Sequence, residues 1–201
     1  MKIVIAQALF NSHSYLEYRK LMADLLKDGK STAVEQTQER THYSELNESR
    51  MRRLDKTMRI TDENRAKLKA LTKRYIWLVL SESWCGDAAQ ILPILHKMEL
   101  ESKGKIEMKL VLRDENEMLM NHFLTNKSKA IPKLIVIDKE TGSVVGDWGP
   151  RPQGAVNLIE AYKAEFGSID ETVKANLQLW YLHDKGLSTQ NEINQLLQNL
   201  E

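Results

Sequence analysis

The 201-residue sequence contains one cysteine, four prolines and nine glycines. A single cysteine excludes a disulfide within the chain and is typical of a protein of the reducing cytoplasm. No apolar stretch approaches the roughly 20 residues that a membrane-spanning helix needs. Residues 1–10 resemble a signal peptide only weakly, because Gln7 interrupts their apolar run and no small-residue cleavage site follows. We therefore expect a soluble, cytoplasmic protein with no membrane partner.

Neither sign of charge is in excess, since 29 Lys and Arg residues face 28 Asp and Glu residues, giving a net charge of +1. A nucleic-acid surface usually shows a clustered excess of basic residues, so we expect no nucleic-acid partner. The five histidines are scattered along the chain, and no glycine-rich loop for phosphate is present. The sequence therefore predicts neither a bound metal nor a cofactor.

The residue pattern divides the chain into three zones. Residues 1–73 are polar and helical in pattern, and we interpret them as an N-terminal helical extension with helices at about 15–28, at about 41–58 and from 62. Residues 167–201 are again helical, forming a C-terminal extension whose last helix we expect to begin with a capping box of Thr189 and Glu192. We expect both extensions to pack on the middle zone.

Residues 74–166 contain the β-strand signals. The apolar run Tyr75–Leu80 predicts a buried strand, and a helix (about 87–102) and a second strand (106–112) follow it. A further helix (about 115–124) leads to a hairpin of residues 134–137 and 143–148. Strands joined by a helix are usually parallel and hairpin strands are antiparallel. The predicted fold class is therefore α/β, with a mixed central sheet flanked by helices.

The only cysteine, Cys85, lies at the junction between the first strand and the helix after it. Unpaired backbone N–H groups and the helix dipole favour a thiolate at such a position, and the thiolate is the nucleophile. Gly86 allows the tight turn. The alternative is that Cys85 is a small buried hydrophobic residue without chemistry.

The sequence Trp84-Cys85-Gly86 after an apolar strand, with Pro93 inside the following helix, resembles the active site of thioredoxins. A second segment, Ala130 to Ile135, resembles the thioredoxin segment in which a cis-proline faces the active-site cysteine. The resemblance implies a thioredoxin-like fold, with Pro132 as the cis-proline and a substrate groove formed by Ile131, Pro132, Gly149 and Pro150. The Asp-Ala pair after Cys-Gly resembles a bacterial thioredoxin-like subfamily.

Two departures from thioredoxin change the expected chemistry. The second cysteine of thioredoxin is replaced by Ala88, and the buried acid of thioredoxin is replaced by Val79. No intramolecular disulfide can therefore form. What the resemblance leaves is monothiol exchange, in which Cys85 attacks a disulfide and an external thiol releases the adduct.

Charged and aromatic neighbours complete the candidate site. Asp87 either caps the helix or opposes the thiolate by its negative charge, and Trp84 either shields the sulfur or simply packs. Arg113 and Asp114 follow the second strand, where Arg113 either stabilises a thiolate or forms a surface salt bridge. Arg151 places positive charge near Cys85 if its loop borders the site.

These residues support two main hypotheses. The first is a monothiol disulfide oxidoreductase whose partner is a protein or low-molecular-weight thiol or disulfide. The second is a binding module without redox activity that grips an extended peptide in the groove. A dimer bridging a cluster through one Cys85 from each chain ranks last, because one ligand per chain needs an external partner.

Overall fold

A computed structural model describes residues 1–201. The helices are α1 (Lys2–Phe10), α2 (Tyr15–Lys27), α3 (Gln38–Thr57), α4 (Asp62–Lys69), α5 (Gly86–Glu101), α6 (Glu117–His122), α7 (Gln153–Phe166), α8 (Glu171–Asp184) and α9 (Leu187–Gln198). The strands are β1 (Tyr75–Ser81), β2 (Ile106–Leu112), β3 (Lys133–Asp138) and β4 (Val144–Trp148). None of the helices combines the length and apolar character needed to cross a membrane.

The four strands form one mixed sheet in the order β2-β1-β3-β4. β1 runs parallel to β2 and antiparallel to β3, and β3 pairs with β4 in an antiparallel hairpin. This confirms the predicted fold class. Because Ser81 pairs with Leu112 and Leu80 with Lys133, the last residues of β1 and β2 and the first residues of β3 lie together at one end of the sheet. The segments that follow or precede these strands are brought together there.

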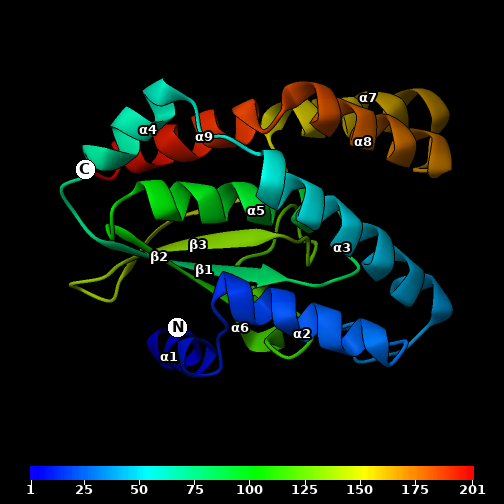
Figure 1. Ribbon diagram of the computed structural model, residues 1–201, viewed down its shortest axis with the longest axis horizontal. Helices are drawn as coiled ribbons and strands as arrows, with labels where there is room; N and C mark the ends of the chain where they lie inside the picture. Colours follow the sequence, from blue (N-terminus) through cyan, green and yellow to red (C-terminus); the bar gives the residue numbers. More distant parts are fainter.

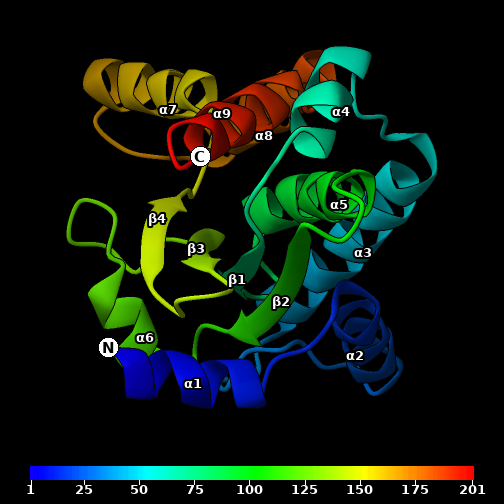
Figure 2. The same cartoon turned by 90° about the vertical axis from the view of Figure 1, so that its left-hand side faces the viewer.

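Helices cover both faces of the sheet (Figures 1 and 2). α5 lies directly on one face, and α3, α4 and α9 pack against α5. On the other side of the sheet, α1 contacts α6 and β2, and α2 also contacts β2. Three helices from outside the central zone, α3, α4 and α9, therefore pack around α5, whose first residue follows Cys85.

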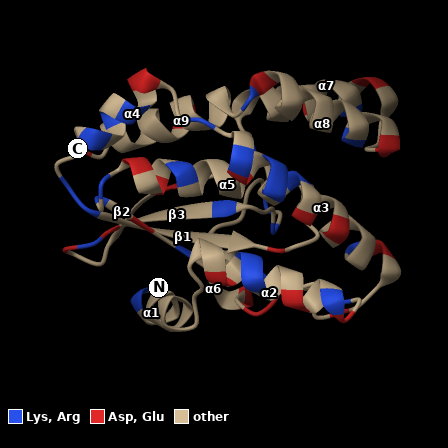
Figure 3. Cartoon of the chain, in the orientation of Figure 1, with Lys and Arg blue, Asp and Glu red and all other residues tan.

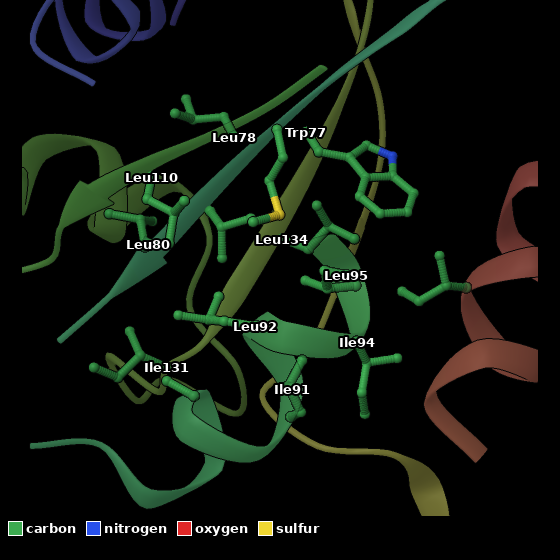
Figure 4. Packing of buried hydrophobic residues seen from close by; sticks show 14 of the residues in the cluster. Trp77, Leu78, Leu80, Ile91, Leu92, Ile94, Leu95, Leu110, Ile131 and Leu134 are labelled. Carbon is green, nitrogen blue, oxygen red and sulfur yellow. The ribbon is translucent and has the colours of Figure 1, made fainter. Parts of the chain in front are cut away.

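The core is a single cluster of buried side chains drawn from all three zones, including Tyr18, Trp77 and Ile193. Figure 4 shows its centre, where residues of α5 such as Leu92 and Leu95 pack against strand residues such as Trp77. Fully burying one large apolar side chain stabilises a fold by about 1.5–3 kcal/mol, so these contacts hold α5 firmly on the sheet. The outer helices share this core rather than building their own.

The start of α9 differs from the prediction. Gly186, with a φ of +75°, is the residue before the helix, and α9 begins at Leu187. Thr189 and Glu192 lie inside the helix, so the predicted capping box is wrong. The Glu192 carboxylate instead accepts hydrogen bonds from Trp148 Nε1 (2.8 Å) and Gln153 N (2.7 Å). Glu192 therefore ties α9 to the end of β4 and the start of α7, a long-range use that local sequence does not reveal.

Other boundaries shift by a few residues. α3 begins at Gln38, three residues before the predicted start, because Thr37 caps it by accepting a hydrogen bond from Arg40 N (3.2 Å). α6 spans only Glu117–His122, shorter than predicted at both ends. No bounds were predicted for α1, which lies in the N-terminal extension, residues 1–73.

Candidate functional site

Cys85 caps the N-terminus of α5. Its Sγ accepts a hydrogen bond from Ala88 N (3.5 Å) and donates one to the Ile131 carbonyl oxygen (3.2 Å). The Ile131–Pro132 peptide bond is cis, and Cys85 is 8% exposed. The structure therefore places the sulfur between the start of α5 and the segment before β3, at the end of the sheet where β1 and β2 finish and β3 begins.

Burial outweighs the helix terminus in setting the acidity of this thiol. Desolvation and the negative charge of Asp87 raise the pKa of Cys85 to about 12, while the Ala88 N–H and the charge of Arg151 act in the opposite direction. From the sequence alone, a helix terminus is expected to favour the thiolate. In the folded protein that effect is present but smaller, so Cys85 is a neutral thiol at neutral pH.

Asp87 is a buried charge at the site with two side-chain partners. Its carboxylate accepts hydrogen bonds from Arg151 Nε (2.8 Å) and from the Tyr181 hydroxyl (2.7 Å), and it is 7% exposed. Burial raises the pKa of Asp87, and the ion pair with Arg151 and the Tyr181 hydrogen bond lower it. Arg151 thus borders the site, as its loop position suggested, but its guanidinium is paired with Asp87.

The guanidinium groups of two arginines lie over the ring of Trp84. The Arg113 guanidinium carbon lies 4.8 Å from the centre of the Trp84 ring, and that of Arg40 lies 5.6 Å away. Arg113 also forms an ion pair with Asp114 (2.7 Å). This is the salt bridge expected as the alternative to stabilisation of a thiolate by Arg113. The indole nitrogen of Trp84 is buried without a hydrogen-bond partner.

A cavity of about 570 Å³ opens beside Cys85. Trp84, Cys85, Gly86 and Asp87 form one wall, and Arg151 adjoins them. The facing walls come from the outer helices: Glu39, Arg40, Tyr43, Leu46 and Arg50 of α3, and Glu171, Lys174, Ala175, Leu177 and Gln178 of α8. Sequence reasoning had no signal for these facing residues, because they come from segments far away in the chain.

The groove expected from Ile131, Pro132, Gly149 and Pro150 differs from this cavity, since none of the four lines it. Ile131, Pro132 and Pro150 are buried. Gly149 packs on Pro132 so closely that a Cβ at its position, with φ at +119°, would lie 2.4 Å from the Pro132 carbonyl oxygen. The two loops therefore pack against each other, and the open space beside Cys85 lies toward α3 and α8.

A buried polar network that the sequence pattern does not indicate precedes the turn that carries Cys85. Glu82 is 1% exposed; one carboxylate oxygen accepts the Thr32 hydroxyl and the other accepts the Asp114 N–H (3.0 Å). The next residue, Ser83, bonds Ser44 Oγ (2.7 Å), and its carbonyl accepts from Asn47 Nδ2 (2.8 Å). The only local signal was a Glu-Ser pair that ends an apolar run directly before Trp84.

The fold and the site together define a thioredoxin-like protein with one cysteine, at the turn between β1 and α5. The family model described as thioredoxin matches residues 33–163, and the chain belongs to this family. The match begins inside the segment interpreted as the N-terminal extension.

Two solved structures share the fold at low identity. One is a protein of unknown function from Pseudomonas aeruginosa, with a TM-score of 0.64, 16% identity and 98% of each chain covered. The other is an HIV epitope-scaffold, with a TM-score of 0.56 and 19% identity, covering 93% of this chain and 99% of that one. A search of curated proteins finds no match.

Asp87 and Arg151, the two charges that act on the Cys85 pKa, predict opposite changes in its reactivity. Asp87→Asn removes a negative charge that raises the Cys85 pKa, so alkylation by iodoacetamide at pH about 8 becomes several-fold faster. Arg151→Gln removes a positive charge that lowers this pKa, so alkylation slows. Equal rates in both variants and the wild type would show that these charges do not control the thiol.

Glu82 predicts a pH dependence of stability. Burial raises the pKa of Glu82 from its ordinary value of 4.5 to about 7, so the folded state holds the proton more tightly than the unfolded state. The contribution of Glu82 to the free energy of unfolding is fully present below pH about 4.5 and is lost as the pH rises toward about 7. The free energy of unfolding changes by roughly 3 kcal/mol over this range.

Glu82→Gln removes this titration while keeping the side-chain size. Urea unfolding across this pH range is expected to show the wild type losing stability relative to Glu82→Gln as the pH rises. Glu140→Gln, at an exposed position, controls for the loss of one charge. A wild-type-to-variant difference that stays constant with pH would contradict the assignment.

Proposed function

We propose that the protein carries out monothiol thiol–disulfide exchange through Cys85. The observation that supports this most is the place of the sulfur: it caps α5, lies 3.2 Å from the Ile131 carbonyl oxygen and borders a 570 Å³ cavity. A disulfide bound in that cavity has a nucleophile beside it. No other cysteine is present to compete for the adduct.

The exchange balances in two steps. The Cys85 thiol gives up its proton, its sulfur forms a bond to one sulfur of the substrate disulfide, and the other substrate sulfur leaves and takes a proton as a free thiol. A second, external thiol then attacks the substrate sulfur of the mixed disulfide. Cys85 is released as a thiol, and the external thiol ends in a new disulfide with the substrate half.

The raised pKa of Cys85 slows the first step by lowering the thiolate fraction, and it also makes Cys85 a poorer leaving group in the second step. Only the thiolate attacks, and at neutral pH burial and Asp87 keep its fraction small. The rate therefore depends on holding the disulfide against the sulfur for long enough, which is what a cavity supplies. A partner that binds here is favoured over a reagent that meets the thiol by collision.

A second candidate is a binding module without redox activity, which the absence of a second cysteine also favours. The observation that favours this candidate is the burial of Cys85, which at 8% exposure has little contact with solvent. In that case the cavity binds a partner and the sulfur only packs. The two candidates differ in whether a covalent adduct forms.

Mass spectrometry of the intact protein separates them. Incubated with hydroxyethyl disulfide, the folded wild type is expected to gain one mercaptoethanol adduct, which added thiol removes. Cys85→Ser keeps a helix-capping side chain and is expected to gain none. If the folded wild type stays unmodified while the urea-unfolded chain is modified, Cys85 is silent in the fold and the binding module replaces the exchange reaction.

A further inference from the structure

Arg50 is the one cation of the cavity without an acidic partner. Arg40 pairs with Glu35 (3.4 Å), Arg151 with Asp87 (2.8 Å) and Lys174 with Glu171 (2.6 Å). Arg50 has no carboxylate within ion-pair distance, and its Nη1 donates only to the neutral Asn47 amide oxygen (2.7 Å). A half-buried guanidinium has five N–H donors, so most of its hydrogen-bonding capacity is free.

The position of Arg50 brings its charge to the active-site turn. A Cβ built on Gly86 would lie 3.9 Å from Arg50 Nη1, and Gly86 follows Cys85 directly. Figure 3 shows that Lys and Arg gather in the C-terminal half of α3, which lies over α5 in this view. Burial, followed by the charge of Arg53, lowers the pKa of Arg50, as expected for a guanidinium without a counter-ion.

Gln178 of α8 supplies a second donor at the same place. Its Oε1 accepts a hydrogen bond from Gln90 Nε2 (2.8 Å), which orients the side-chain amide. Its Nε2 then lies on the Gly86 side, 3.5 Å from the position of a Cβ on that residue. A guanidinium from α3 and an amide N–H group from α8 thus converge on the space over Gly86.

These donors and the cavity's dimensions describe a ligand. A volume of 570 Å³ lies in the range of about 300–1,000 Å³ that small-molecule sites occupy. Tyr43, Leu46 and Trp84 supply apolar walls, and the two donors fit a carboxylate, which a guanidinium binds in a bidentate manner. The lining holds four cations, Arg40, Arg50, Arg151 and Lys174, against three acids. Asp87 and Glu171 are paired, and the third acid, Glu39, is exposed and lies about 16 Å from Arg50 along α3, so the preference for an anion remains.

We infer that the cavity binds a low-molecular-weight disulfide or thiol bearing a carboxylate, which Arg50 and Gln178 hold so that its sulfur meets Cys85. This inference rests on the proposed exchange at Cys85 and gives it a substrate class. The covalent step is the one already described, with the anionic compound as the disulfide or as the releasing thiol.

A series of three small disulfides tests the charge preference: dithiodipropionate (dianionic), hydroxyethyl disulfide (neutral) and cystamine (dicationic). Adduct formation on the wild type at low ionic strength is expected to be fastest with dithiodipropionate. Arg50→Gln is expected to slow that reaction roughly tenfold more than it slows the neutral reaction. Arg52→Gln, an exposed arginine on the same helix outside the cavity, removes the same charge and is expected to change neither.

An equal loss with all three disulfides, or no loss with dithiodipropionate in Arg50→Gln, would overturn the inference. In either case adduct formation on the wild type would still support exchange at Cys85.

Binding without chemistry gives an independent test. Suberate has the chain length and both carboxylates of dithiodipropionate but no sulfur. Calorimetry is expected to show suberate binding to Cys85→Ser, kept when Arg52→Gln is added and lost when Arg50→Gln is added. Absence of suberate binding to Cys85→Ser would refute the anion site whatever Cys85 does, whereas Arg50-dependent binding would support it even if no adduct formed.

Discussion

The Asp87 carboxylate, bonded to Arg151 and Tyr181, is the interaction on which the site depends. It joins the start of α5, the loop after β4 and helix α8, three segments that are distant in the chain. Through Tyr181 it fixes α8, which forms a wall of the cavity beside Cys85. Through its charge it raises the Cys85 pKa, so one buried carboxylate governs both the shape and the acidity of the site.

Two opposing effects meet at the sulfur, and burial is the larger. The α5 terminus offers the Ala88 N–H and the positive end of a helix dipole, which favour thiolate. Desolvation acts against any charge, and here it outweighs the dipole, whose contribution is at most about 2 kcal/mol. A neutral thiol in a preformed cavity makes ligand binding the step that selects what reacts.

The four strands and the mixed character of the sheet could be predicted from the sequence because their signals are local, whereas the strand order was not predicted. The apolar run at Tyr75, the helix containing Pro93 and the hairpin near Gly142 each carry their own pattern. Cys85 and Pro132 were found in the same way, by short motifs. Tyr181, Arg50 and Gln178 could not be found, because only the packing of α3 and α8 on α5 brings them to the site. The predicted capping role of Glu192 was wrong for the same reason, because its partners, Trp148 and Gln153, lie about 40 residues away in the chain.

The measurement that tests this account most directly is the pH dependence of Cys85 alkylation in the folded wild type, where the single thiol makes the signal unambiguous. With a pKa of about 12, the rate is expected to rise about tenfold per pH unit from neutral pH to beyond the ~8.5 of a free cysteine, without a plateau. A plateau reached below that value would contradict the account. It would show that the helix terminus, rather than burial and Asp87, sets the state of the thiol.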